Sequence, residues 1–196
     1  MKEYNFEQTI TEEGEWLHEP RSYSCEQGLV IQTEPQTDFW QRTHYGFSRD
    51  NGHFLYTSCN YDFSMEVHME FEPENRYDQC GLMVRIDSNN WIKISTEYED
   101  EEISRLGSVV TNLGYSDWAT TDISSDIKSM WYRVNKRGKD FMIESSREGK
   151  EWSQMRICHL DEGFYNLKVG VYACSPEPGS FECKVKKLRL KKNECE

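Results

Sequence analysis

Strict alternation of apolar and polar side chains is the feature that most constrains how this chain folds. From Phe63 to Phe71 every second residue is apolar, and the residues between them are Ser, Glu or His. Successive side chains of a β-strand point to opposite faces, so this stretch predicts a strand with one buried and one solvated face. The strand is expected to end at Glu72-Pro73, because proline has no N–H to donate to a sheet ladder.

Segments of strand character recur along the sequence and are separated by turn residues at intervals of about ten residues. No useful helical period is present, and no linker, low-complexity tract or strict repeat divides the chain. The sequence therefore predicts an all-β antiparallel sandwich in one domain, residues 1–196. The expected strands are Leu29–Gln32, Phe54–Thr57, Phe63–Phe71, Gln79–Ile86, Trp91–Tyr98, Ser108–Asn112, Trp131–Lys136, Asp140–Ser146, Leu167–Ala173 and Phe181–Leu190.

The charge balance excludes two classes of partner. The chain has 23 basic and 35 acidic residues, a formal net charge of −12. Such a surface repels phosphate backbones and anionic lipid heads, so we expect neither a nucleic-acid partner nor a membrane partner. The one basic stretch, Lys184 to Lys192, alternates with apolar residues. We interpret it as the solvated face of an edge strand, where lysines oppose edge-to-edge pairing.

The seven cysteines are scattered, without the spacing of a metal site or of a disulfide framework. The N-terminal residues lack the apolar segment of a secretion signal, and no apolar run is long enough to span a membrane. We therefore expect a cytoplasmic protein with free thiols, and no metal or other cofactor. The cysteines expected to pack as small buried side chains are Cys80, Cys158, Cys174 and Cys183.

The clearest hairpin joins Gln79–Ile86 to Trp91–Tyr98. A turn centred near Asn89 predicts that Arg85 lies opposite Lys93, and the alternate residues of both strands form an apolar face toward the core. Two like charges in register are unfavourable unless an acid or a ligand lies between them. The polar face is therefore either a binding site or a solvated face with a ladder of ion pairs. It carries Gln79, Met83, Arg85, Lys93, Ser95 and Glu97.

A second cluster, Asp38 to Phe47 followed by Asp50 to His53, combines aromatic rings with turn formers. Flat rings beside carboxylate, amide and guanidinium groups suit a sugar, whose C–H faces stack on rings while its hydroxyls pair with planar polar groups. The same cluster is also consistent with three core rings and a plain turn. The core assignment is favoured for Phe39, Trp40 and Phe47, and the role of Arg42, His44 and Tyr45 stays open.

Three weaker features bear on chemistry. Tyr115 to Trp118 is expected to form a loop in which Trp118 either flanks a cleft or pins the loop down. Glu97 and Glu99 are two apart on a strand and point to one face, and a glycoside hydrolase needs two carboxylates; the segment that continues to Glu102 is equally typical of a solvated acidic loop. His44 and His53 are close in sequence, but no carboxylate at suitable spacing accompanies them, so no metal site is predicted.

Several motifs together resemble one family, DUF1349, and the two strings YDQCGLMVR and DFWQRTHYGF are the most specific of them. The resemblance spans almost the whole chain, with a core of about residues 16–190. The matching residues are Trp16 with Pro20, 37–40, 43–47, 51–53, 77–85, 91–93, Glu97-Tyr98 and 116–118.

The resemblance implies a concanavalin A-like jelly-roll sandwich, with two curved antiparallel sheets of about a dozen strands and any site on the concave face. The chain is similar to an intracellular branch of the family that includes fungal proteins described as regulators of enolase. The acidic signature ExDxxE of the fold's laminarinase-type glucanases is absent, which weighs against glycoside hydrolysis, and fold alone does not define activity.

Three functions follow as hypotheses. The first is a non-catalytic binding module for a carbohydrate or a related polyhydroxylated metabolite. The second is a regulatory factor of central carbon metabolism that acts through a protein partner, with exposed strand edges or the acidic loop at Glu97–Glu102 as its surface. The third is a glycoside hydrolase with Glu97 as its acid or base. The expected ligand contacts are Asp38, Arg42, His44, Tyr45, Asp78, Gln79, Arg85, Lys93, Glu97 and Trp118.

Overall fold

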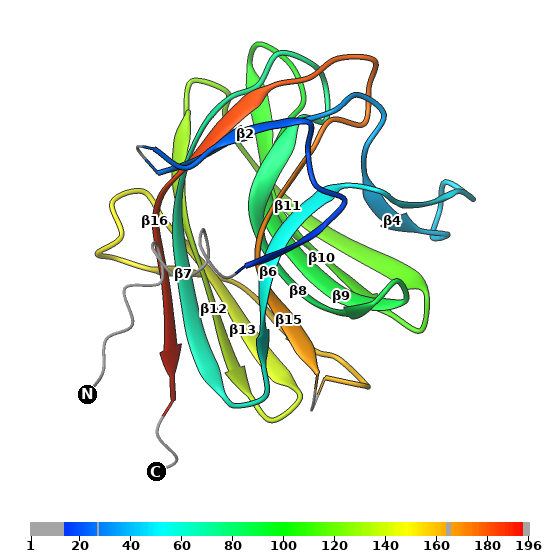
Figure 1. Cartoon of the computed structure of the whole chain (residues 1–196), viewed down its shortest axis with the longest axis vertical. Helices are drawn as coiled ribbons and strands as arrows, with labels where there is room; N and C mark the ends of the chain where they lie inside the picture. The colour runs from blue at the N-terminus through cyan, green and yellow to red at the C-terminus, as the bar shows by residue number, and fades with distance from the viewer. Residues whose placement is uncertain (1–13, 27, 164–165, 194–196) are drawn as a thin grey trace.

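The computed structural model describes residues 14–26, 28–163 and 166–193 of the chain. These residues form strands joined by turns and loops (Figure 1). Among them no helix is long and apolar enough to cross a membrane. The strands are β1 (Glu15–Leu17), β2 (Ser22–Ser24), β3 (Leu29–Gln32), β4 (Phe39–Gln41), β5 (Ser48–Asp50), β6 (His53–Cys59), β7 (Phe63–Glu72), β8 (Gln79–Asp87), β9 (Asn90–Tyr98), β10 (Ile103–Asn112), β11 (Tyr115–Ser124), β12 (Ser129–Arg137), β13 (Asp140–Ser146), β14 (Ser153–His159), β15 (Leu167–Cys174) and β16 (Glu182–Lys192).

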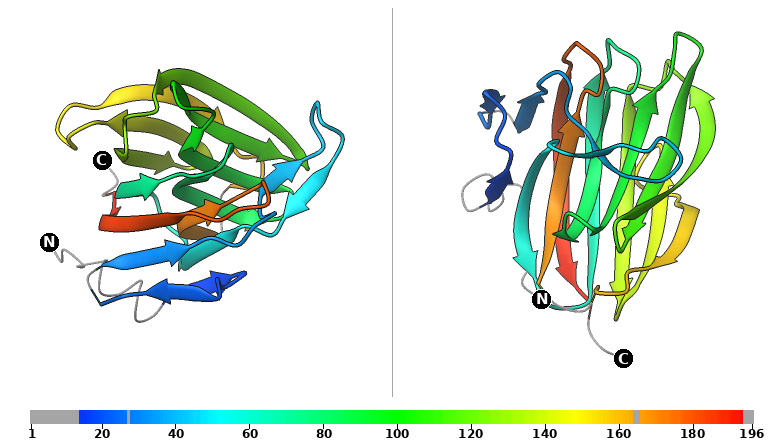
Figure 2. Two further views of the ribbon diagram at one scale, coloured as in Figure 1. Left: turned by 90° about the horizontal axis from the view of Figure 1, so that it is seen from above. Right: turned by 90° about the vertical axis from the view of Figure 1, so that its right-hand side faces the viewer.

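Two seven-stranded antiparallel sheets lie face to face (Figure 2). Sheet I has the order β1-β6-β15-β8-β9-β10-β11, and sheet II has the order β14-β13-β12-β7-β16-β3-β2. A separate two-stranded hairpin, β4-β5, lies on the side of sheet I that faces away from sheet II (Figures 1 and 2). The predicted antiparallel sandwich is therefore confirmed.

The alternating pattern that predicts the sandwich also fills its core. In β7 the apolar residues are buried and the residues between them are half-buried, as expected for a strand with a solvated outer face. Val67 of sheet II and Leu82 and Ile94 of sheet I belong to one main core cluster, which contains residues of both sheets. Burial of this surface is the main stabilising contribution to such a fold.

A second, smaller apolar cluster lies on the other face of sheet I. Phe39 and Trp40 of β4 pack there against Met83 of β8, Trp91 of β9 and Tyr172 of β15. Phe39 meets both Trp91 and Tyr172 edge to face, with ring centroids 6.3 and 6.2 Å apart. The hairpin is thus held on the sheet by aromatic packing, and the site described below lies beside it.

The structure corrects the predicted register of the β8–β9 hairpin. Arg85 lies opposite Trp91, and Met83 lies opposite Lys93, so the prediction that Arg85 faces Lys93 is wrong. The turn closes on the pair Asp87 and Asn90, and the register shifts between Arg85 and Asp87. The turn and the bulge each shift the pairing by one residue from the predicted register, and a total shift of two preserves the assignment of side chains to faces. The predicted core face and polar face are both confirmed.

Two other assignments differ from expectation. The segment predicted as a flanking loop, Tyr115–Trp118, begins the long strand β11 and pairs with β10. The basic strand β16 is an edge only in part, because Glu182–Val185 pair with β3 as well as with β7, whereas Lys187–Lys192 pair with β7 alone. Among the cysteines predicted to be buried, Cys158 is half-buried and the rest are buried; they are Cys80, Cys174 and Cys183.

Candidate ligand-binding site

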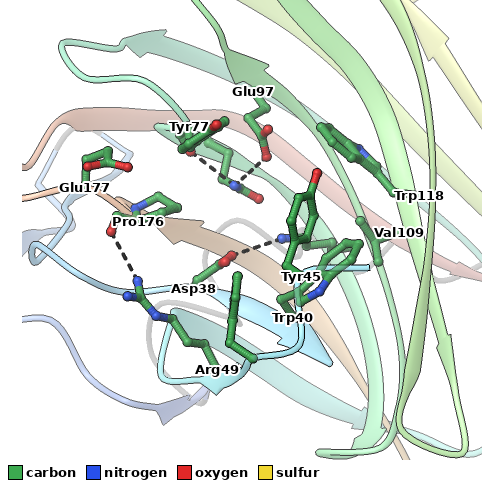
Figure 3. A pocket seen from close by; sticks show the side chains of 13 residues that line it. Asp38, Trp40, Tyr45, Arg49, Tyr77, Glu97, Val109, Trp118, Pro176 and Glu177 are labelled. Carbon is green, nitrogen blue, oxygen red and sulfur yellow. Dashed lines mark hydrogen bonds and ion pairs between the residues drawn. The ribbon is translucent and has the colours of Figure 1, made fainter. Parts of the chain in front are cut away.

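A pocket of about 240 Å³ lies between the β4–β5 hairpin and the outer face of sheet I. Figure 3 shows its side chains pointing into a common space, with Trp118 and Val109 on one side and Tyr77, Pro176 and Glu177 on the other. The complete lining is Asp38, Trp40, Tyr45, Phe47, Arg49, Tyr77, Gln79, Lys93, Glu97, Val109, Trp118, Pro176 and Glu177.

Small residues in register lie on the sheet between the two polar groups of the pocket. Gly81 of β8 pairs with Ser95 of β9, which pairs in turn with Gly107 of β10. These three positions form a row without bulky side chains across the face that carries the site. The row separates Glu97 on one side from Lys93 on the other, because side chains two residues apart in a strand share a face.

The hairpin that covers one side of the pocket is shaped by local backbone geometry. Arg42, His44 and Gly46 have φ values of 57°, 63° and 72°, in the left-handed region. The N–H of Arg42 donates to the carbonyl of Phe47 at 2.8 Å, which closes the turn between β4 and β5. The tight turn brings Tyr45 and Phe47 to the mouth of the pocket, where both are exposed.

A buried ion pair forms part of the floor. The Lys93 ammonium lies 3.2 Å from Oδ1 of Asp38, and both residues are buried. Burial is the largest single influence on the pKa of Lys93 and lowers it, but the charge and hydrogen bond of Asp38, together with the nearby Cys174 and Glu97, outweigh it, so the pKa lies above its ordinary value. Asp38 also accepts a hydrogen bond from the N–H of Phe39 at 2.7 Å, which fixes its carboxylate ahead of β4. The charges of Lys93 and Asp38 therefore compensate each other within the pocket.

A second polar group consists of Glu97 and the amide of Gln79. Gln79 donates from Nε2 to Oε2 of Glu97 at 2.7 Å, and its Oε1 accepts from the hydroxyl of Tyr172 at 3.1 Å. The amide is thereby oriented and holds Glu97 at the pocket wall. Burial raises the pKa of Glu97 to about 7; Lys93 opposes the rise, and Asp38 and Glu99 add to it. This carboxyl therefore titrates closer to neutral pH than an exposed glutamate does.

Aromatic rings form the opposing walls. Tyr45 stacks on Phe47 with centroids 6.1 Å apart and meets Trp40 edge to face at 5.4 Å. The indole N–H of Trp40 donates to the carbonyl of Thr43 at 3.0 Å, which ties this ring to the hairpin turn. Trp118, from the edge strand β11 of sheet I, completes the walls (Figure 3).

Six of the predicted contact residues line the pocket: Asp38, Tyr45, Gln79, Lys93, Glu97 and Trp118. Arg85 does not. Its guanidinium binds both carboxylate oxygens of Asp50 at 2.7 Å, so it tethers the hairpin strand β5 to sheet I. The bulge near Arg85 leaves it one row away from the Lys93–Asp38 pair, which explains the difference.

Three further predicted contacts also lie outside the pocket lining. Asp78 is buried and accepts from the N–H groups of Glu74 and Asn75 and from the hydroxyl of Ser175, so it fixes the loop before β8. Arg42 is exposed, with its guanidinium carbon 5.4 Å from the ring centroid of Tyr115.

His44 is exposed on the hairpin turn and touches Tyr45. His53, by contrast, is buried: its Nε2 accepts from the N–H of Glu34 at 3.0 Å, and its Nδ1 lies 2.7 Å from the carbonyl oxygen of His18. The two histidines therefore do not share a site. No group of three or more His, Cys, Asp or Glu side chains in the described ranges is arranged to hold a metal ion.

Several lining residues were not identified from the sequence. Phe47, which was assigned to the core, is 42% exposed at the pocket mouth. Arg49 donates to the carbonyl of Pro176 at 3.2 Å and so joins β5 to the segment after β15. Arg49, Pro176 and Glu177 carry no sequence signal, because only the tertiary fold brings these segments together. Trp40 and Tyr77 lie within the motifs that resemble the family, which was the one available signal.

The sandwich and the position of the pocket define the class of protein. The chain is a concanavalin A-like jelly-roll sandwich of two curved antiparallel sheets, with a pocket on the outer face of one sheet. It belongs to the family described as "Protein of unknown function (DUF1349)", whose model matches residues 16–193.

Two yeast proteins are similar over nearly the whole chain. "Regulation of enolase protein 1" of Saccharomyces cerevisiae is 38% identical over 175 residues, which cover 89% of this chain and 87% of the relative. A crystal structure of a functionally unknown protein from Saccharomyces cerevisiae superposes with a TM-score of 0.86 at 34% identity, covering 94% of this chain and 98% of that chain. The family resemblance is thereby confirmed.

More distant structures share the fold alone. A xylan β-1,4-xylosidase from Bacillus halodurans C-125 superposes with a TM-score of 0.70 at 15% identity. The superposition covers 89% of this chain and 35% of that enzyme. The alginate lyase from Klebsiella pneumoniae gives a TM-score of 0.57 at 8% identity, covering 85% of this chain and 81% of that chain. At such identities the likeness supports the jelly-roll fold and nothing about activity.

Proposed function

We propose that this chain binds a carbohydrate, or a related polyhydroxylated metabolite, in the pocket between the β4–β5 hairpin and sheet I, without transforming it. The observation that carries the proposal is the combination of aromatic walls with a polar floor in one pocket. The aromatic faces offer stacking surfaces for C–H groups, and Asp38, Gln79 and Glu97 offer planar donors and acceptors for hydroxyl groups.

The dimensions of the pocket favour a small ligand. Its volume of about 240 Å³ lies just below the range of about 300–1,000 Å³ that is common for small-molecule sites. One sugar ring suits this space, whereas an extended chain would have to continue past Tyr45 and Phe47. The polar floor is held in place before any ligand arrives, because Gln79 and Asp38 are fixed by their hydrogen bonds.

The test is a ligand screen with a matched pair of tryptophan variants. We expect thermal-shift screening of monosaccharides and sugar alcohols to find a ligand, which calorimetry then quantifies. Trp118→Ala should weaken binding by about 1 kcal/mol, roughly fivefold, since it removes one stacking wall. Trp152→Ala is the control, because Trp152 is also half-buried but packs against Arg133 of sheet II. Equal binding by the two variants, or no stabilisation by any sugar at millimolar concentration, would contradict the proposal.

Glycoside hydrolysis is the alternative function that must be distinguished from binding alone. Glu97 has the raised pKa of a candidate general acid, but a raised pKa also follows from burial in any binding pocket. Release of reducing sugar that disappears in Glu97→Gln would establish catalysis and would replace the binding-only proposal.

A regulatory role is the second candidate, and it rests on the relative named "Regulation of enolase protein 1". In this alternative the chain acts on a glycolytic enzyme through a protein surface. The acidic segment after β9 is partly committed to structure, since Asp100 accepts from the N–H groups of Glu102 and Ile103. Direct binding to purified enolase, measured by surface plasmon resonance, tests the idea, and its absence would contradict it.

The cytoplasm is the location that we propose for this activity. In the part of the chain that the structure describes, six cysteines are free thiols, and four of them are buried. A reducing compartment keeps such thiols free. Fluorescence imaging of the tagged protein in cells tests the proposal, which accumulation in a secretory compartment would overturn.

A further inference from the structure

The charges of the pocket are unequally satisfied. Its two cations both have partners: Lys93 pairs with Asp38, and Arg49 donates to the carbonyl of Pro176 while lying 5.7 Å from the ring centroid of Phe47. An anionic group of a ligand would therefore have to displace an existing contact. The formal net charge of −12 adds to this disadvantage.

Glu97 is in the opposite situation. Its Oε2 accepts from the Gln79 amide, and no Lys, Arg or His side chain of the described residues lies within ion-pair distance of it. A neutral amide compensates a carboxylate less well than a cation does. Glu97 thus presents acceptor capacity at the pocket wall that no cation within the described chain satisfies.

The opposing walls also favour positive charge. Trp40, Tyr45, Phe47 and Trp118 line the same space as Glu97. The face of an aromatic ring attracts a cation, and the attraction grows when water is excluded. A carboxylate on one side and aromatic faces on the other form a combination that binds a protonated amine.

We propose that the ligand of this pocket carries a protonated amine, as an amino sugar does, and that the amine binds between Glu97 and the aromatic walls. This inference rests on the proposed function, because it specifies the class of sugar bound at the same site. The hydroxyl groups of the ring then face Asp38 and Gln79, and the ammonium group supplies the positive charge that Glu97 lacks.

Proton exchange should accompany the binding of such a ligand. The pKa of Glu97 lies at about 7 in the free protein because burial raises it. A ligand cation favours the ionised carboxylate, so binding near or below neutral pH should release a proton. Several charged or titratable side chains interact electrostatically with the Glu97 carboxyl. They are Lys93 and Glu99 near it on the chain, Asp38 before β4, Arg105 on β10, Tyr77 before β8, and Tyr172 and Cys174 on β15.

The experiment is calorimetric titration of the full chain with four probes: glucosamine, glucose, N-acetylglucosamine and cyclohexylamine. At neutral pH glucosamine should bind at least roughly tenfold more tightly than glucose or N-acetylglucosamine, as expected for one charge-assisted hydrogen bond. Its affinity should rise at least roughly tenfold from about pH 5 to about pH 7, while that of glucose should not follow this trend.

Variants show whether Glu97 carries the preference. In Glu97→Gln the ratio of the glucose and glucosamine dissociation constants should fall close to one, and the pH dependence of glucosamine binding should disappear. Glu101→Gln, an exposed neighbour on the acidic loop, should retain both. A preference that survives in Glu97→Gln would overturn the assignment.

The four probes also separate this inference from the proposed function. Equal binding of glucose and glucosamine overturns the amine and leaves sugar binding intact. Binding of cyclohexylamine alone supports the amine and overturns the sugar. Failure of all four probes to bind overturns the amine, and the screen of monosaccharides and sugar alcohols then decides whether sugar binding stands.

Discussion

At the scale of single residues, Glu97 is the position where stability and function conflict. It is placed opposite Gln79, in a pocket wall where its ionised form is poorly solvated. Such a carboxyl is retained at a cost to the folded state, and sites of this kind are typical of binding and catalytic surfaces. The face on which Glu97 lies could be predicted from alternation alone, but its burial and raised pKa could not.

Replacement of Glu97 should therefore change how stability depends on pH. The folded-state pKa of about 7 exceeds the ordinary value of 4.5, so the folded protein holds a proton that the unfolded chain has lost between these limits. The free energy of unfolding should thus fall as pH rises through this window. We expect Glu97→Gln to remove that loss and to gain about 1–3 kcal/mol relative to wild type between about pH 5 and about pH 8.

Urea unfolding at a series of pH values measures this difference. Glu101→Gln is the control, since Glu101 is exposed on the loop after β9. Curves of stability against pH that stay parallel for Glu97→Gln and wild type would show that the carboxyl is not strained in the folded state.

At the scale of elements, the β4–β5 hairpin decides whether the pocket exists. Strand periodicity did not identify β4 or β5, because each has three residues and both lie within a segment rich in turn formers. Their attachment depends on Phe39, buried among Trp91 and Tyr172, and on the paired hydrogen bonds between Arg85 and Asp50. These contacts join positions far apart in sequence, so local patterns carry no information about them.

Loss of the Arg85 tether should loosen the hairpin while the sandwich stays folded. We expect Arg85→Met to lower the free energy of unfolding by about 2–4 kcal/mol, because Asp50 loses both charge-assisted hydrogen bonds. Trypsin should then cleave faster at Arg42 or Arg49, and ligand affinity should fall although Arg85 does not line the pocket.

Arg105→Met serves as the matched control on the same sheet. Arg105 pairs with Glu99 and Asp122, but its side chain is 29% exposed against 6% for Arg85, so its loss should cost less than about 1 kcal/mol. Equal rates of tryptic cleavage in Arg85→Met and wild type would show that the hairpin does not depend on this tether.

At the scale of the whole molecule, one core spans both sheets, and the second cluster depends on the outer face of sheet I. Neither sheet can keep its apolar face buried without the other. We therefore expect the chain to unfold as a unit, and the single domain predicted from the sequence stays a prediction until unfolding is measured.

Thermal unfolding followed by two probes tests this expectation. Far-ultraviolet circular dichroism reports the sheets, and near-ultraviolet circular dichroism reports the packed aromatic rings. The two midpoints should coincide within error, and the calorimetric and van't Hoff enthalpies should agree. Separate transitions would indicate that the sandwich or the hairpin region folds independently.

The sequence by itself determined the β-sandwich, most of its long strands and the face of the β8–β9 hairpin that bears the site. These features depend on side-chain alternation with a period of two, which is a local property and survives a register shift of two residues. The negative charge was likewise fixed by composition.

Only the tertiary structure decided which polar residues meet. The turn at Asp87 and Asn90 and the adjacent bulge place Met83 opposite Lys93. The Lys93 ammonium then pairs with Asp38, which belongs to a segment outside sheet I. The register also placed the row of Gly81, Ser95 and Gly107 between Lys93 and Glu97. Such contacts depend on strand order, register and hairpin docking together, and these follow from packing over the whole molecule rather than from any short stretch of sequence.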